Sequence, residues 1–198
     1  GAYYYDNGES DEGQAYLYLG SSSGLATTPA WTGESNQASA YYGWSVSTAG
    51  DINGDGYSDV LVGARYYDNG ESNEGQAYLY LGSASGLATT AAWTGESNQA
   101  SSYYGYSVST AGDINGDGYS DVLVGAHYYD NGQGDEGRAF LYLGSGDSLT
   151  STPNLTLDGQ EAGGKFGSKV VSVGDANGDG YYDVVVGSSL ADNGNGKV

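Results

Sequence analysis

An acidic nine-residue segment with Asp or Asn at positions 1, 3, 5 and 9 occurs three times in the sequence, at residues 51–59, 113–121 and 175–183. Side-chain oxygens at this spacing, with the main-chain carbonyl of position 7, supply the hard oxygen ligands that Ca²⁺ and Mg²⁺ prefer. Ca²⁺ fits better, because it accepts about six to eight oxygens in irregular geometry, whereas Mg²⁺ prefers about six and retains several waters. The pattern therefore predicts about three Ca²⁺ ions per chain.

The candidate metal ligands are the first, third, fifth, seventh and ninth residues of each segment. They are Asp51, Asn53, Asp55, Tyr57, Asp59, Asp113, Asn115, Asp117, Tyr119, Asp121, Asp175, Asn177, Asp179, Tyr181 and Asp183. Glycines at positions 4 and 6 allow the backbone to fold tightly around an ion. A Gly/Asx-rich turn that binds nothing is the simpler alternative, but three copies that keep every oxygen ligand favour a metal site. Such calcium is expected to be mainly structural, tying two strands together.

Two other readings of the acidic segments are excluded. An EF-hand needs a bidentate Glu at position 12, where this chain has Val62, Val124 and Val186. A catalytic site is also not supported, because His127 is the only His, Cys is absent, and no Ser has a nearby general base. We therefore expect no enzymatic activity.

The charge of the chain limits its partners. Five Lys and Arg oppose 25 Asp and Glu, which gives a formal net charge of −20, and such a surface repels nucleic acid and anionic membranes. The acidic segments hold nine of these carboxylates, so three bound Ca²⁺ would bring the charge to −14. No stretch approaches the roughly 20 apolar residues of a membrane span. We therefore expect no nucleic-acid partner and no membrane insertion.

The acidic segments belong to a tandem array. A shift of 62 residues superposes them without a gap and defines units at 1–62, 63–124 and 125–186, with a partial unit at 187–198. The first two units are identical at 56 of 62 positions. We interpret residues 1–198 as one repeat array whose ends cut through a repeat.

Within a unit, apolar and polar residues alternate with a period of two, which is typical of half-buried strands. Four strands are predicted per unit, near 43–49, 59–64, 76–82 and 91–95 around the first acidic segment. The predicted fold class is all-β, with β-propeller blades of four antiparallel strands. The chain holds enough strands for about three blades. They are the last two strands of one blade, two complete blades and the first two strands of another. Closed propellers have about four to eight blades, so the ring is incomplete and needs missing chain or oligomerisation, for example a six-bladed head-to-tail dimer.

Short motifs flank every acidic segment. An aromatic-Gly pair precedes it and Val-Gly-Ala or Val-Gly-Ser follows it; these are Tyr42-Gly43, Tyr104-Gly105 and Phe166-Gly167, and residues 62–64, 124–126 and 186–188. This order resembles the FG-GAP repeat family, the integrin-α-like β-propeller repeats, although Arg65 and His127 stand where that family usually has Pro. The resemblance implies seven-bladed propellers with calcium in the loop between the first two strands of a blade, held by positions 1, 3, 5, 7 and 9. It also implies a secreted or cell-surface location and adhesion or ligand recognition on a propeller face.

Three functions follow from these observations. The first is a calcium-binding extracellular propeller for adhesion or for recognition of a protein or glycan ligand. The second is a structural building block of a surface assembly or filament without a discrete ligand. The third is a lectin in which exposed Tyr and Trp, such as Trp31 and Trp93, stack on sugars; packing of these aromatics between blades is expected instead. The acidic turns at 9–12 and 71–74 are expected to be solvated loops.

Overall fold

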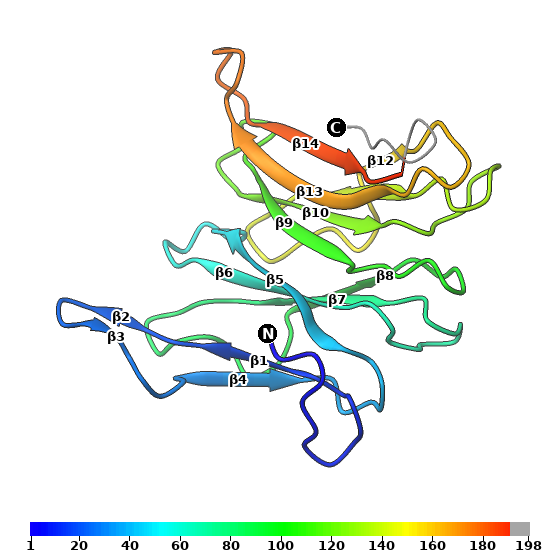
Figure 1. The fold of residues 1–198 in the computed structure, drawn as a ribbon. Helices are drawn as coiled ribbons and strands as arrows, with labels where there is room; N and C mark the ends of the chain where they lie inside the picture. Colours follow the sequence, from blue (N-terminus) through cyan, green and yellow to red (C-terminus); the bar gives the residue numbers. More distant parts are fainter. Residues whose placement is uncertain (191–198) are drawn as a thin grey trace.

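The protein is described by a computed structural model for residues 1–190. In these residues there is no helix and every sheet is antiparallel, which confirms the all-β class. The sheets form successive layers that follow chain order from β1 to β14 (Figure 1). The ring is open, as the repeat count predicts.

Two layers are complete four-stranded blades. The first contains β5 (Tyr42–Gly50), β6 (Asp59–Ala64), β7 (Gln76–Tyr80) and β8 (Trp93–Glu96), in that spatial order. The second contains β9 (Ser107–Gly112), β10 (Asp121–Ala126), β11 (Arg138–Tyr142) and β12 (Leu155–Asp158). All four strands predicted per unit are therefore present, with ends that differ from the prediction by two residues at most.

The outer layers are half-blades. At one end β1 (Gln14–Leu17) pairs with β4 (Trp31–Glu34), and at the other β13 (Phe166–Gly174) pairs with β14 (Asp183–Ser188). A small hairpin of β2 (Gly20–Ser21) and β3 (Gly24–Leu25) was not expected. In the next unit the residue equivalent to Gly20 is Gly82, whose N–H donates instead to Asp59 at 2.8 Å.

Neighbouring blades are joined through their aromatic residues. Trp31 and Trp93 are each only 8% exposed. The indole Nε1–H of Trp31 donates to the carbonyl of Ala88 at 2.9 Å, and that of Trp93 to the carbonyl of Thr150 at 3.1 Å, both in the following blade. The lectin prediction is therefore wrong for these two residues, because indoles that pack between blades cannot stack on a sugar.

Tyrosine pairs fill the interior of each complete blade. The buried hydroxyl groups of Tyr42 and Tyr80 lie 2.8 Å apart, and those of Tyr104 and Tyr142 are also 2.8 Å apart. Burial, followed by the interaction with Tyr142, holds the pKa of Tyr104 well above its usual value. These residues are therefore neutral hydrogen-bonding groups of the core, as the expected packing role requires.

Candidate metal centre

The three acidic segments occupy the same place in three successive blades. Residues 51–58 join β5 to β6, residues 113–120 join β9 to β10, and residues 175–182 join β13 to β14. The loops between β5 and β6 and between β13 and β14 project on the same side of the array (Figure 1). Each loop turns at two glycines with positive φ, which are +72° and +88° at Gly54 and Gly56. Residues with a Cβ disfavour this region, so the loop shape depends on glycine there.

Main-chain N–H groups wrap around the first carboxylate of each loop. Asp51 accepts from the N–H of Asp55 at 3.1 Å and from that of Gly56 at 2.9 Å. The carboxylate of Asp55 in turn accepts from Tyr57 N at 2.9 Å. The other two loops repeat the pattern around Asp113 and Asp175. These bonds hold the oxygens of positions 1 and 5 on the inner side of the loop.

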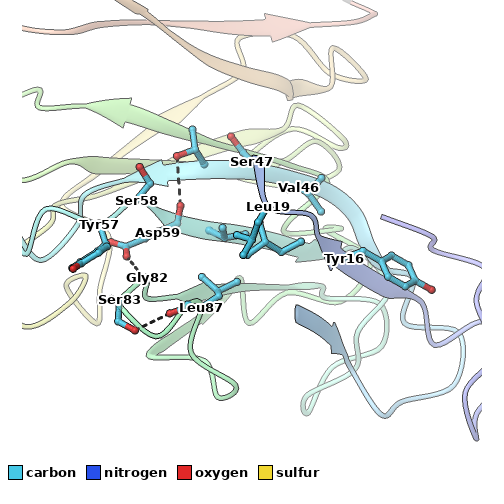
Figure 2. Close-up of a pocket in the computed structure, with 14 residues that line it drawn as sticks. Tyr16, Leu19, Val46, Ser47, Tyr57, Ser58, Asp59, Gly82, Ser83 and Leu87 are labelled. Atoms are coloured by element: carbon cyan, nitrogen blue, oxygen red, sulfur yellow. Dashed lines mark hydrogen bonds between the residues drawn. The ribbon is translucent and has the colours of Figure 1, made fainter. Parts of the chain in front are cut away.

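The carboxylate at position 9 lies deeper than the others. Asp59 is fully buried and accepts from Ile52 N at 2.8 Å and Gly82 N at 2.8 Å, and Figure 2 shows its side chain beside Gly82. Asp121 is also fully buried and accepts from Ile114 N at 2.8 Å and Gly144 N at 2.9 Å. Position 9 therefore ties the loop to the turn that follows the third strand of the same blade.

Burial and neighbouring carboxylates act on the protonation of these groups. Burial raises the pKa of Asp59 and of Asp121, and the nearby carboxylates of positions 5 and 1 raise it further, although the two N–H donors oppose this. At the exposed Asp175, hydrogen bonds led by that from Gly180 lower the pKa instead. The first two loops thus concentrate acidic oxygens, and ionisation is disfavoured at Asp59 and Asp121. A bound dication would offset this repulsion.

In the described part of the chain, no Lys, Arg or His forms an ion pair with a loop carboxylate. The only ion pair there joins Arg138 to Asp158. Across residues 1–190, no three His, Cys, Asp or Glu side chains converge as a ready-made metal site, because the loop carboxylates face main-chain N–H groups. The donor set still fits Ca²⁺, since each loop offers three carboxylates, an Asn oxygen and a carbonyl and contains no softer ligand. The metal assignment of the fifteen predicted residues stays a prediction.

Adjacent loops also contact one another. Ser120 of the second loop donates its N–H to the carbonyl of Asp51 at 2.9 Å, and its hydroxyl accepts from Asp51 N at 3.1 Å. The ring of Tyr119 lies against Gly54, where an added Cβ would come within 2.9 Å of it. The ring of Tyr181 covers Gly116 in the same way. Adjacent loops are therefore in direct contact through Ser120 and Tyr119.

Comparison with known proteins places these loops in a family. A profile for the FG-GAP repeat matches residues 42–80, 104–142 and 166–198, which is more than half of the chain. The chain belongs to the FG-GAP repeat family. Each match begins at the aromatic residue of an aromatic-Gly pair, as the resemblance in the sequence predicts.

The curated relatives of this FG-GAP chain include integrin alpha chains. It is 36% identical to integrin alpha-5 of Xenopus laevis over 154 residues, which cover 75% of this chain and 14% of the relative. It is 34% identical to mouse integrin alpha-8 over 157 residues (77% and 14%) and 34% identical to chicken integrin alpha-V over 167 residues (80% and 16%). The chain thus matches about one seventh of each relative's length.

The glycines of the FG-GAP motif have a physical role between blades. A Cβ added to Gly63 would lie 2.0 Å from the carbonyl oxygen of Gly105, and one added to Gly125 would lie 2.0 Å from that of Gly167. The hydroxyl of Ser45 donates to the same Gly105 carbonyl at 2.7 Å. The Gly of one blade's Gly-Ala therefore packs on the backbone of the next blade's aromatic-Gly, and both motifs are needed for this close approach.

Some functional features escaped the sequence reasoning. Gly82 and Gly144 anchor position 9 through their N–H groups, but nothing in the residue type of a glycine indicates this. The expectation of solvated acidic turns is wrong for Glu12 and Glu74, which are 1% and 0% exposed. Each accepts a 2.6 Å hydrogen bond from the N–H five residues before it. The repeated Glu-Gly pair, which stands before a strand in both units, was the available signal.

Proposed function

We propose that this FG-GAP array, taken as residues 1–198, is a calcium-binding β-propeller module for adhesion or recognition of a protein or glycan ligand. The observation that carries the proposal is the recurrence of one loop geometry, with the same ligand types, at the same end of three successive blades. An extracellular or cell-surface location follows from the adhesion role that the FG-GAP resemblance implies. Within residues 1–190, no helix is long and apolar enough to span a bilayer.

Calcium in this proposal is mainly structural, with about three ions per chain. In each loop, positions 1, 3, 5 and 9 would hold the ion through side chains and position 7 through its carbonyl. The ion supplies positive charge among three carboxylates that the protein leaves without a cation. Position 9 then links the ion to the core, because Asp121 also accepts from Gly144 of the adjacent turn. Calcium would thereby fix the first three strands of a blade relative to one another.

Thermal unfolding with and without calcium tests the proposal. A ligand that binds only the folded state stabilises it by about 2.7 kcal/mol at 100 times its dissociation constant, so the melting temperature is expected to rise on adding CaCl₂ and fall with EDTA. Asp117→Asn should reduce this rise. Asp147→Asn removes the same charge from an exposed residue outside the loops and should leave the rise unchanged. Equal melting temperatures in calcium and EDTA would overturn the proposal.

The array is also proposed to be completed by further blades, from a longer chain or a second copy. Val46 is 49% exposed, whereas Val108 and Val170 at the equivalent positions are 6% and 1% exposed. At the opposite end Val173 is 48% exposed, whereas the equivalent Ala111 is fully buried. Both flanks thus present apolar side chains that internal blades cover. For a second copy, light scattering in calcium should report a dimer, and a stable monomer would exclude it.

We propose no catalytic role for the chain. The single imidazole, His127, is 6% exposed and packs on the ring of Tyr106, with ring centroids 3.7 Å apart. Burial, with Lys165 and Arg65 nearby, lowers its pKa to about 3. A side chain with this pKa is a poor general base at neutral pH.

A further inference from the structure

A cavity of about 420 Å³ lies at the end of the strands opposite to the metal loops, and basic side chains line it. Arg65 follows the last residue of β6, and His127 follows the last residue of β10 in the next blade. Lys165 precedes β13 in the third blade and completes the group, with tyrosine rings between them. We refer to this space as the cationic cavity. None of the residues that line it, all in the described part of the chain, is acidic.

The basic residues are departures from the repeat. Arg65 and His127 occupy the position that Tyr3 holds in the first unit, and Lys165 occupies the position of Tyr41 and Tyr103. The chain has only five Lys and Arg in 198 residues. Two of them, together with the only His, gather at one cavity of a chain with a net charge of −20.

Two polar side-chain nitrogens at the cavity, a donor on Arg65 and a ring nitrogen of His127, lack a partner. Arg65 Nε and His127 Nδ1 are both buried and form no hydrogen bond in the described structure. The His127 side chain is 94% buried, since only 6% of its surface is exposed. Buried polar groups are normally paired, so two unpaired nitrogens beside one cavity indicate missing hydrogen-bond partners, an acceptor in the case of Arg65 Nε.

Aromatic rings hold the guanidinium of Arg65 in place. Its Cζ lies 3.5 Å from the ring centroid of Trp44 and 4.3 Å from that of Tyr66. Contacts with ring faces do not use the N–H groups of the planar guanidinium, and its Nε has no hydrogen-bond partner. The N–H edge of a guanidinium matches the two oxygens of a carboxylate. Lys165 is positioned similarly: its Nζ donates to the hydroxyl of Tyr128 at 2.5 Å.

We propose that the cationic cavity binds a carboxylate side chain from an acidic segment of a protein ligand. Arg65 supplies the two-pronged contact, Lys165 supplies a second positive charge, and His127 Nδ1 supplies a further hydrogen-bonding atom. The inference deepens the proposed function, on which it rests for the idea that the chain recognises a ligand, by naming the chemistry of that ligand. The overall negative charge does not exclude it, because charges beyond about 8 Å are largely screened at physiological ionic strength.

The proposal is tested with the blocked tripeptide Glu-Glu-Glu and its uncharged counterpart Gln-Gln-Gln, by titration into the ¹⁵N-labelled chain in calcium. The Glu peptide should shift amide signals around Arg65 and His127, and the Gln peptide should not. Arg65→Tyr, which installs the residue of the first unit, should weaken binding at least tenfold. Arg138→Gln installs the residue of both earlier units, Gln14 and Gln76, and removes an equal charge outside the cavity. It should change binding less than twofold.

Several results would overturn the proposal. They are absence of binding by the unaltered chain, equal binding of the Gln peptide, and an Arg65→Tyr variant that folds and binds as tightly as the parent. Inorganic phosphate that displaces the Glu peptide and binds more tightly would reassign the cavity to phosphate groups. Failure of the calcium proposal can be distinguished from failure of the carboxylate proposal. The first is tested by melting temperatures, and the second by peptide binding to a chain shown to be folded.

Discussion

Replacement of Asp121 by Asn separates the structural role of position 9 from its proposed role in metal binding. Asp121 is fully buried and accepts from Ile114 N and Gly144 N. Asn has one acceptor oxygen, so its NH₂ group must face one of these N–H donors. Loss of a hydrogen bond to a charged group destabilises by about 1.5–3 kcal/mol, and an unsatisfied buried donor by about 1–3 kcal/mol. Burial raises the pKa of Asp121, so removal of its charge recovers part of the lost stability. We therefore expect the free energy of unfolding to fall by about 2–4 kcal/mol without calcium.

The assay is chemical denaturation in EDTA and in calcium, followed by the signal of the buried tryptophans. Asp117→Asn is the matched control, because Asp117 is exposed and its replacement should change stability in EDTA by about 0.5 kcal/mol or less. Asp183→Asn is a second control. Asp183 accepts from Ala176 N at 2.8 Å but is only partly buried, so a smaller effect than that of Asp121→Asn is expected.

The outcome in the two buffers distinguishes the roles. Both Asp121→Asn and Asp117→Asn should reduce the calcium-dependent gain in stability, but only Asp121→Asn should be strongly destabilised in EDTA. The reasoning is refuted if Asp121→Asn matches the parent in EDTA within about 0.5 kcal/mol. If its calcium response is also undiminished, position 9 is not a ligand.

Three further predictions follow from packing and charge. Tyr104→Phe alone should destabilise by about 1–3 kcal/mol because it leaves the Tyr142 hydroxyl unpaired, whereas the double variant Tyr104→Phe/Tyr142→Phe should be close to the parent; additive losses in a double-mutant cycle would contradict this. Gly63→Ala should destabilise by about 1–3 kcal/mol through its contact with Gly105, whereas Gly187→Ala, whose nearest neighbour would be Lys169 Cβ at 3.5 Å, should be tolerated in thermal melts. Because the pKa of His127 is about 3 when folded and 6.5 when unfolded, the unfolded state binds more protons between these values, and stability should fall by up to about 5 kcal/mol as pH drops from 6.5 to 3. His127→Tyr, compared with the parent in denaturation at each pH, should lack this part of the acid dependence, and parallel curves would disprove it.

Much of the fold could be predicted from the sequence because the repeat constrains it. The 62-residue period, the alternation with a period of two and the turn residues gave both complete blades and both half-blades. The unexpected β2–β3 hairpin shows where this reasoning stops. Its sequence is nearly the same as that of residues 82–87, and the difference between them is a distant contact, the carboxylate of Asp59 that holds Gly82.

The sequence predicts which residues form the candidate site, but not how deeply each of them is buried. The spacing of Asp and Asn predicts the candidate oxygen ligands of each loop, because all of them lie within one nine-residue segment. It did not indicate that Asp59 and Asp121 are fully buried while Asp55 and Asp117 are exposed. Position 9 is covered by the turn after the third strand of the blade, where Gly82 and Gly144 lie 23 residues from Asp59 and Asp121 in the chain. The packing of Trp31 and Trp93 between blades was expected, but their hydrogen-bond acceptors, which lie 57 residues away, could not be predicted from local sequence.

The repeats vary differently at the two ends of the strands, where the acidic loops and the cationic cavity lie. This difference bears on the role of each end. The loops at 51–59 and 113–121 are identical, although they lie in different blades. At the opposite end, Arg65 replaces Tyr3 and Tyr106 replaces Trp44, and these are two of only six differences between the first two units. The third loop differs from the first two at Ala176 and Tyr182 but keeps Asp or Asn at positions 1, 3, 5 and 9, which is what the proposed structural role of the loops requires. The cationic cavity takes a different side chain from each blade, and a surface that recognises one ligand gains its specificity from such differences.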